Sequence, residues 1–493
     1  MEKHPFLTCT PEEAGIPSSA LIRFLNALKR QRVCLHSFLI IRHNKIAYEA
    51  NWSPMNSTEL HRMYSVSKSF VSVAIGMLQE EGKISLDDKI VDYFPEYNVN
   101  NLHPYHKNAT IKDMLKMSSL FDDQPYDGAK DLDWISTFFH TKPQHESGSI
   151  MCYDTMATIL CSVIVEKVTG KKLLDYMRPA FLDPIGFSED AWCVETPCGH
   201  SWAGSGIMCS TRDLAKFANV IMHYGQFEGK QILPEAYLRE ATSYQISNFV
   251  NKATIQEGYG YQFWRTSGNG FGCFGMGSQI AICLPDLDMV IVMTGDTQEM
   301  ETRQYAAYHL FFDLVYPEIQ NLTASINKKD VQILKEMTSN LVLQTAPGSS
   351  SHPMMQEINH KKYVLDDNPL KWTSVQFDFQ QDEGIITYVN DRGEKQLHFG
   401  LGKQVITSFP ETHYSGYRIS VPNNQEYRCA ISAGWDAPGT LTLVCYIIDD
   451  YFGTLKMNFA FKDTSMTLYA SKVAEWFLDD YQGTASGHLV ILD

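Results

Sequence analysis

Several features that would assign a function directly are missing from this 493-residue sequence. Basic residues are in deficit: 41 Lys and Arg stand against 57 Asp and Glu, which gives a formal net charge of -16. Nucleic acids and anionic membranes are bound by clustered Lys and Arg, so we expect no nucleic-acid partner. No stretch approaches the roughly 18 apolar residues that cross a bilayer, so we expect no membrane span.

Patterns typical of metal sites, disulfides and secretion are missing too. The eleven cysteines include no Cys-x-x-Cys pair, and the sixteen histidines include no His-Glu-x-x-His spacing. We therefore expect free thiols, no metal and no cofactor. Residues 1–20 contain charged and proline residues and no apolar core, so we expect no secretory signal and predict a cytoplasmic location.

Two common enzyme folds are also excluded by their motifs. No Gly-x-Ser-x-Gly elbow occurs, so an α/β-hydrolase fold would have no nucleophile here. The six residues from Gly270 to Gly275 do spell Gly-x-Gly-x-x-Gly. A β-rich run follows them where a dinucleotide-binding unit needs a helix, so we do not interpret them as a cofactor site.

What the sequence does contain is enough apolar material for two cores. Hydrophobic residues make up 44% of the chain, and single cores stop growing at about 250 to 300 residues. Turn residues between apolar runs predict hairpins over 37–52 and 279–294. Apolar periodicity predicts helices over 66–81, 155–168, 300–316 and 329–343, and one that begins near Ser210.

The composition and the apolar periodicity of the chain change in its last third. Residues 345–353 are rich in Ser, Gly and Pro, which is typical of a linker. Beyond them apolar residues alternate with period two, as in Val375, Phe377 and Phe379. We therefore predict three segments: a domain over 1–325, a helix and linker over 326–353, and an all-β barrel or sandwich over 354–493.

One tetrad at the start of a predicted buried helix could carry chemistry. In Ser65-Val66-Ser67-Lys68 the spacing of three places the hydroxyl of Ser65 and the ammonium of Lys68 one turn apart on the same helix face. A helix N-terminus supplies unpaired N–H groups, and burial lowers the pKa of a lysine, so that Lys68 could act as a base. The tetrad alone is weak evidence, because Ser325-Ile326-Asn327-Lys328 has the same pattern.

The residues around Ser65 carry a family resemblance. Met63 to Phe70, the run Glu81-Gly82-Lys83-Ile84-Ser85-Leu86-Asp87-Asp88 and Tyr93-Phe94-Pro95-Glu96 resemble the class C β-lactamase, DD-peptidase and serine esterase superfamily. Later segments, 204–217, 229–234 and 258–264, follow in the family's order. The resemblance covers roughly residues 10–320. It implies an α/β (α+β) serine β-lactamase-like fold, in which helices flank an antiparallel sheet and a helical subdomain spans residues 85–200.

The resemblance also implies roles for individual residues. Tyr153-Asp154-Thr155 resembles the family's Tyr-x-Asn motif, which makes Tyr153 the implied proton-transfer group and places Thr155 where the family has a substrate-binding Asn. Cys273-Phe274-Gly275 corresponds to the family's Lys-Thr-Gly or His-x-Gly motif and would contact substrate. The N–H groups of Ser65 and Met276 would form the oxyanion hole.

The differences from the family's motifs at Thr155 and Cys273 determine which substrates we expect. Cys273 offers neither the charge nor the strong donor that would hold a substrate carboxylate. We therefore predict a serine hydrolase that forms an acyl-enzyme with small esters or amides. A β-lactamase or D-amino-acid peptidase acting on short peptides remains an alternative. Two others are an inactive protein that binds peptides or cell-wall fragments, and a protein whose β domain is the functional module.

Overall fold

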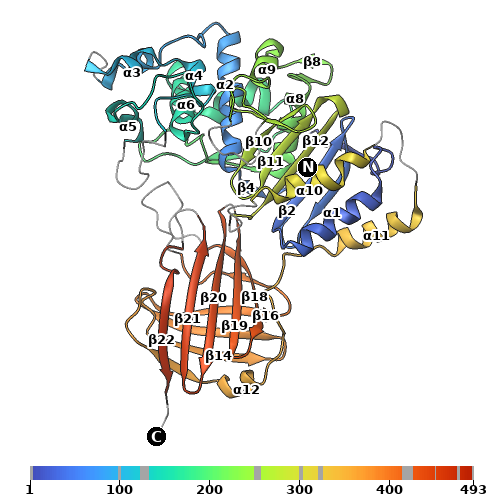
Figure 1. The fold of residues 1–493 in the computed structure, drawn as a ribbon, viewed down its shortest axis with the longest axis vertical. Helices are drawn as coiled ribbons and strands as arrows, with labels where there is room; N and C mark the ends of the chain where they lie inside the picture. Colours follow the sequence, from blue (N-terminus) through green and yellow to red (C-terminus); the bar gives the residue numbers. More distant parts are fainter. Residues whose placement is uncertain are drawn as a thin grey trace. The chain divides into compact units, whose positions relative to one another are not determined.

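The structure is a computed structural model of the chain. It describes residues 4–97, 101–122, 133–248, 257–298, 304–319, 326–412, 426–449, 451–474 and 478–490. These residues form two compact units, of which one runs to Leu341 and the other begins at Val342 (Figure 1).

A seven-stranded sheet forms the centre of the first unit, in the order β1-β3-β2-β12-β11-β10-β9. Its strands are β1 (Leu7–Thr8), β2 (Leu35–Arg42), β3 (Lys45–Asn51), β9 (Trp264–Thr266), β10 (Gly270–Gly275), β11 (Gln279–Leu284) and β12 (Met289–Gly295). Every neighbouring pair is antiparallel except the short β1–β3 pair. Both predicted hairpins are confirmed. In the first turn His43 and Asn44 both have positive φ, 53° and 58°, as tight hairpin turns require.

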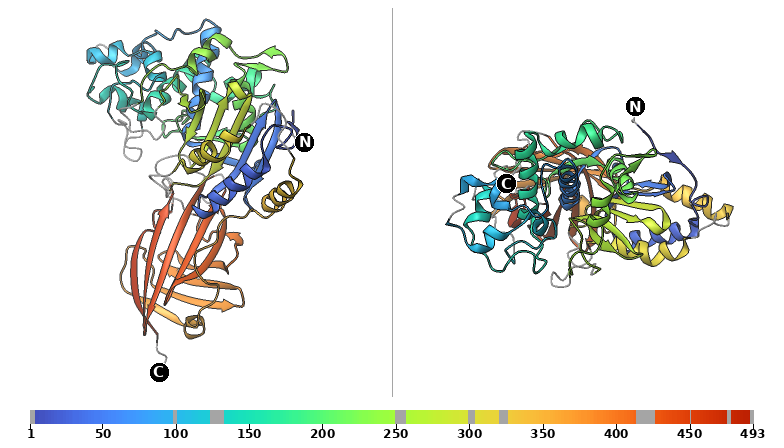
Figure 2. Two further views of the ribbon diagram at one scale, coloured as in Figure 1. Left: turned by 45° about the vertical axis from the view of Figure 1, so that its right-hand side comes forward. Right: turned by 90° about the horizontal axis from the view of Figure 1, so that it is seen from above.

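Helices cover both faces of this sheet (Figure 2). On one side lie α1 (Ser18–Arg30), α10 (Ala306–Leu314) and α11 (Lys328–Ser339), and on the other α2 (Ser67–Glu80) and α8 (Thr211–Met222). Phe24 of α1 contacts Phe38 of β2 with ring centroids 4.8 Å apart, and Phe70 of α2 stacks on Phe217 of α8 at 3.9 Å. The helix predicted over 300–316 is shorter than expected, although residues 300–303 lie outside the described ranges.

The predicted helical subdomain is confirmed between α2 and α8. It contains α3 (Pro104–Asn108), α4 (Ile111–Leu115), α5 (Trp134–His140), α6 (Thr155–Thr169) and α7 (Leu173–Met177). Helix α6 is buried along most of its length and ends at Gly170, whose left-handed φ of 70° terminates it. The unit is completed by α9 (Glu235–Ala241), by a small sheet of β4 (Leu60–Arg62), β5 (Trp192–Cys193) and β6 (Ile207–Ser210), and by the pair β7 (Gln226–Phe227) and β8 (Lys230–Gln231).

The second unit is the predicted all-β domain, and it is a barrel. Its strands are β13 (Lys362–Leu365), β14 (Ser374–Gln380), β15 (Glu383–Asn390), β16 (Gly393–Leu401), β17 (Val405–Ser408), β18 (Arg428–Ala437), β19 (Thr440–Ile448), β20 (Phe452–Lys462), β21 (Ser465–Val473) and β22 (Gly483–Leu489). Pairing of β16 with β18 closes nine of them, and β17 adds to β18. Alternate residues such as Phe377, Leu455 and Phe459 are buried, which explains the period of two.

The segment predicted as a linker is bonded to the second unit. The N–H of Ala346 donates to the Ser432 hydroxyl of β18 at 2.8 Å, and Ser349 forms a β-bridge with Trp435. A short helix, α12 (Met354–Ile358), then leads into β13. Across the described ranges, no helix is long and apolar enough to span a bilayer.

The start of α8 gives a first prediction. Ser210 is buried, and its hydroxyl accepts the N–H of Asp213 while the Asp213 carboxylate accepts the N–H of Ser210. Because an N-cap contributes about 1 kcal/mol, we expect Ser210→Ala to lower the Tm of the first unit by about 2–4 °C. Differential scanning calorimetry measures this. Ser210→Thr, which keeps the hydroxyl, is the control, and equal melting of both variants would contradict the capping role.

Candidate active site

Ser65 and Lys68 are brought together as the tetrad predicts. Ser65 lies in the 3-10 turn Tyr64–Val66, which leads directly into α2. The ammonium of Lys68 donates to the Ser65 hydroxyl at 2.9 Å and to the carbonyl of Gly204 at 2.5 Å. Lys68 is only 1% exposed, so these oxygens replace the water that its charge would otherwise bind.

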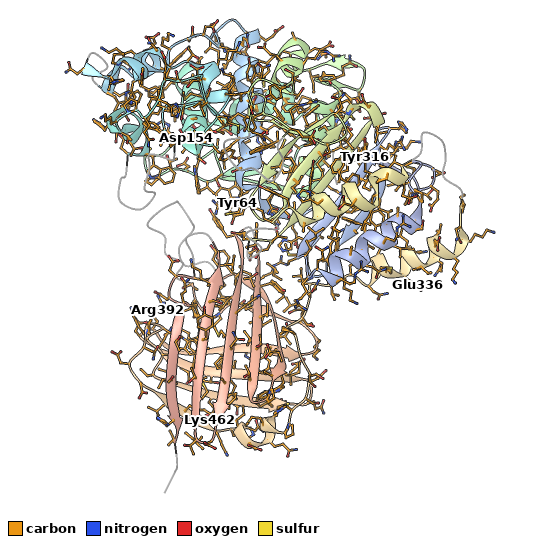
Figure 3. The ribbon with its side chains drawn as sticks, viewed as in Figure 1. Tyr64, Asp154, Tyr316, Glu336, Arg392 and Lys462 are labelled. Carbon is orange, nitrogen blue, oxygen red and sulfur yellow. The ribbon has the colours of Figure 1, made fainter. Side chains whose placement is uncertain are left out.

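The backbone immediately before Ser65 is strained. Tyr64 has a φ of 47°, which a bulky residue adopts only when its surroundings enforce it. The guanidinium of Arg62 lies 4.2 Å from the Tyr64 ring centroid, and its Nε donates to the carbonyl of Ser205 at 3.2 Å. The hydroxyl of Ser67 accepts the N–H of Ile207 at 3.0 Å. The segment around Gly204 thus holds the turn in its strained form. Figure 3 labels Tyr64 within the first unit.

Tyr153 lies beside Lys68 at the start of α6. The Lys68 ammonium is 5.1 Å from the centroid of the Tyr153 ring, a cation–π distance. Trp264 stacks on the same Tyr153 ring, with ring centroids 5.8 Å apart and planes at 22°. Met117, Met151 and Tyr259 form an apolar cluster packed against both rings. Tyr153 therefore contacts both a buried cation and a cluster of aromatic and methionine side chains.

Asp154 is a site residue for which the sequence analysis assigned no role. Its fully buried carboxylate caps α6 by accepting the N–H of Met156 at 2.8 Å, and it also accepts the Ser119 hydroxyl at 2.8 Å. Burial raises the pKa of Asp154 to about 6, against the opposing effects of these hydrogen bonds and of the Lys68 charge. Its position directly before a buried helix is a capping signal that the sequence does contain.

Gln262 is a second residue with no role assigned from the sequence, and it joins three helices. Its carbonyl accepts the hydroxyl of Ser69 in α2 at 2.7 Å, and its side-chain oxygen accepts Thr158 of α6 at 2.8 Å. Its amide donates to the carbonyl of Met114 in α4 at 3.1 Å. No sequence pattern points to this role, because the three partners lie 104 to 193 positions away.

Strand β10 brings the third predicted motif to the same place. Cys273 faces α2 and is 3% exposed, and burial raises the pKa of its thiol to about 12. Phe274 points to the opposite face and packs on Tyr305 and Tyr308. A Cβ on Gly275 would lie 2.4 Å from the carbonyl oxygen of Met63 and 3.2 Å from the N of Ser65. Only glycine allows the strand this close to the turn that contains Ser65.

The turn after Gly275 is held by a buried side chain. The Gln279 amide donates to the carbonyls of Met276 and Gly295 at 2.9 and 2.8 Å, and its oxygen accepts the Gly295 N–H at 3.2 Å. Because both ends of the Gln279 side chain are bonded, it links the backbone at Met276 to the backbone at Gly295.

Thr155 has a different environment from the one that a substrate-binding group needs. It is 8% exposed, and its methyl group packs against the backbone of Gly204, where a Cβ would lie 2.4 Å from it. Gly204 is the residue whose carbonyl holds Lys68. Thr155 therefore packs against the residue whose carbonyl accepts the Lys68 ammonium.

One group of side chains among the described residues could hold a metal ion, and it consists of Asp122, His145 and Cys152, the residue before Tyr153.

Comparison with known proteins decides the family. Residues 26–313 match the Beta-lactamase family model, which is more than half of the chain. The chain belongs to the beta-lactamase family. Its members are hydrolases, so the resemblance seen around Ser65 is confirmed, and this chain is a serine hydrolase of the β-lactamase and penicillin-binding-protein type.

Individual relatives are distant. The 6-aminohexanoate-dimer hydrolase of Paenarthrobacter ureafaciens is 22% identical over 329 residues, 60% of this chain and 82% of its own. The serine beta-lactamase-like protein LACTB, mitochondrial, of Homo sapiens is 23% identical over 292 residues, 39% of this chain and 53% of its own. A solved structure of a putative 6-aminohexanoate-dimer hydrolase from Bacillus anthracis has a TM-score of 0.50 and 20% identity, covering 64% of this chain and 87% of its own. These likenesses support the fold of the first unit.

The raised pKa of Asp154 predicts a pH-dependent stability. A carboxyl group whose pKa is raised on folding contributes stability below about pH 4 and loses it as the pH rises through about 6. We therefore expect the free energy of unfolding of Asp154→Asn, which keeps a capping oxygen, to rise by about 2 kcal/mol relative to that of the wild type between pH 4 and pH 7. Urea unfolding at several pH values measures it, and parallel curves for the two proteins would contradict the shift.

Proposed function

We propose that this protein hydrolyses small uncharged esters or amides through an acyl-enzyme on Ser65. The observation that carries the proposal is the 2.9 Å hydrogen bond between the buried ammonium of Lys68 and the Ser65 hydroxyl, beside the ring of Tyr153. A nucleophile within hydrogen-bonding reach of a proton-transfer group, which is in turn held by a third partner, is the arrangement that acyl transfer requires.

The proposed reaction has two steps. In the first, the Ser65 oxygen attacks the substrate carbonyl and its proton passes to the Lys68–Tyr153 pair, which enters the step one proton short, with Tyr153 as the phenolate beside the Lys68 ammonium; Tyr153 then protonates the leaving alcohol or amine. In the second, the same pair takes a proton from water, which attacks the acyl-enzyme ester, and returns that proton to the departing Ser65 oxygen as the acid is released. The N–H groups of Ser65 and Met276 stabilise the oxyanion in both steps. The close approach of Gly275 to Ser65 supports this part of the proposal.

The surroundings of Ser65 favour a neutral acyl group. Cys273 stands where the family carries a cation, and its thiol is buried and uncharged. The Lys68 ammonium is already bonded to Ser65 and Gly204. Trp264, Tyr259 and the methionines around Tyr153 offer apolar surface. A substrate carboxylate would lose its water here without gaining a matched cation.

The central prediction concerns Ser65. We expect Ser65→Ala to lower kcat/KM for p-nitrophenyl butyrate by about 10³-fold or more, because the covalent path is lost. A fluorophosphonate should label the wild type and not the variant, as mass spectrometry would show. Ser325→Ala changes the head of the sequence's other Ser-x-x-Lys tetrad and is the matched control; it should retain full activity.

Failure of Ser65 to acylate, with no turnover of any ester or amide, would favour a protein that binds peptides or cell-wall fragments without catalysis. Equal loss in the Ser325→Ala control would show that the assay reports folding and not the nucleophile.

Substrate charge gives a separate prediction. We expect kcat/KM for p-nitrophenyl acetate and butyrate to exceed that for nitrocefin, which carries a carboxylate, by about 10²-fold or more, the value of one charge-assisted contact. Steady-state kinetics on the same enzyme preparation measures both. Faster turnover of nitrocefin would instead favour a β-lactamase, and cleavage of D-alanyl peptides alone would favour a peptidase.

A further inference from the structure

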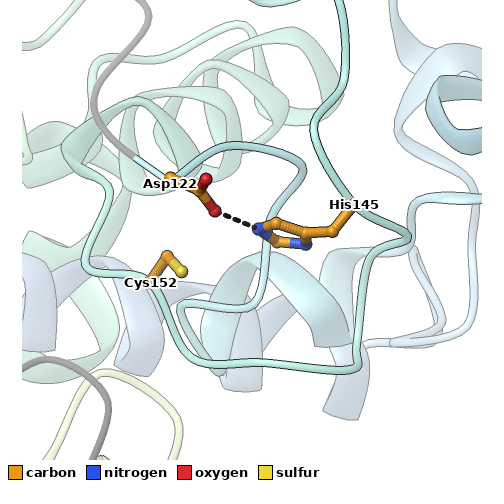
Figure 4. A group of neighbouring side chains, drawn as sticks. All are labelled: Asp122, His145 and Cys152. Atoms are coloured by element: carbon orange, nitrogen blue, oxygen red, sulfur yellow. Dashed lines mark ion pairs between the residues drawn. The ribbon is translucent and has the colours of Figure 1, made fainter.

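Three side chains of metal-ligand type converge beside Tyr153, outside the groups that the proposed reaction uses. They are Asp122, His145 and Cys152, and one ligand atom from each lies within 4.8 Å of the other two (Figure 4). A zinc ion has ligands at about 2.0 to 2.3 Å, so atoms around one ion lie about 3 to 4 Å apart. The cluster is therefore close to the spacing that one ion would impose.

The histidine is oriented as a metal ligand. Its Nδ1 lies 3.2 Å from the carbonyl of Glu146, so the ring proton on Nδ1 can be donated there and the lone pair is left on Nε2. That Nε2 atom is buried and has no hydrogen-bond partner within the described ranges. Asp122 Oδ1 lies 3.6 Å from it, a distance that allows an ion pair, drawn in Figure 4, and exceeds that of a hydrogen bond. A cation bound by His145 Nε2 and Asp122 Oδ1 would give both atoms a partner.

The backbone that carries the three residues is fixed. The N–H of Gln144 donates to the Leu120 carbonyl at 2.9 Å, that of Gly148 to Ser118 at 2.8 Å, and that of Cys152 to Met117 at 2.8 Å. The N–H of Asp122 donates to the side-chain oxygen of Gln144 at 2.7 Å. These hydrogen bonds join residues 117–122 to residues 144–152, the two segments that carry the three ligands. The ligands therefore need only small side-chain rotations to meet around an ion.

We propose that Asp122, His145 and Cys152 bind a divalent transition-metal ion, with Zn²⁺ as the chemistry that fits one oxygen, one nitrogen and one sulfur ligand. Cys152 binds as the thiolate, and its proton is released to solvent. Asp122 is 66% exposed, which gives the ion a path from solvent and leaves the fourth position to water. Because Cys152 is bonded covalently to Tyr153, the ion also fixes the backbone that positions the Tyr153 ring.

The experiment is a Co²⁺ titration of the full-length protein followed by absorbance. A thiolate bound to Co²⁺ gives a charge-transfer band in the near ultraviolet and tetrahedral d–d bands in the visible. We expect both in the wild type and expect Zn²⁺ to displace them, while Cys152→Ser should lose the charge-transfer band. Cys198→Ser, which changes a partly exposed free thiol outside the cluster, is the control and should keep both bands.

Two further variants guard against misfolding of Cys152→Ser. Asp122→Asn changes an exposed side chain, and His145→Gln removes the imidazole; each should weaken Co²⁺ binding by about 10-fold or more. A saturating amount of Zn²⁺ should raise the Tm by at least about 2 °C in the wild type and not in these variants. Absence of a thiolate band in the wild type, or its persistence in Cys152→Ser, would overturn the proposal whether or not the protein hydrolyses esters.

Discussion

The placement of one buried charge organises the first unit of this protein. Lys68 lies in the interior at 1% exposure, and an ammonium there is tolerated only if oxygens replace its water. Two oxygens that its ammonium binds, those of the Ser65 hydroxyl and the Gly204 carbonyl, belong to segments about 140 residues apart. The fold must therefore keep the start of α2 and the segment before β6 in contact, and that same contact holds Ser65 within hydrogen-bonding distance of Lys68.

Other contacts around Lys68 have the same effect. Arg62 and Ser67 bind the segment after Gly204, which holds the left-handed Tyr64 in place. Gln262 connects α2, α4 and α6, so that Tyr153 at the start of α6 cannot move independently of Ser65. Such cross-links cost conformational entropy during folding and leave little to reorganise during a reaction. The strain at Tyr64 is maintained by this network.

The second unit depends on the alternation of buried and exposed residues along its strands and on the closure of its sheet. Its strands bury alternate residues, and closure through β16 and β18 leaves nine strands without a free edge between them. The barrel lies outside the residues 26–313 that match the family model. Its core is filled by side chains such as Phe377, Tyr388 and Trp372, the last two stacked at 3.9 Å. Whatever it contributes, the proposed chemistry is contained in the first unit.

Local patterns in the sequence determined the elements: the hairpins, the buried helices, the helix that begins near Ser210 and the alternation in the barrel all depend on residues a few positions apart. The tetrad at Ser65 followed from the same local geometry, since three positions make one helical turn. Tertiary structure alone decided the rest. Gln262, the packing of Thr155 on Gly204, and the grouping of Asp122, His145 and Cys152 join residues far apart in the chain, and no short-range periodicity records which distant side chains a fold will bring together.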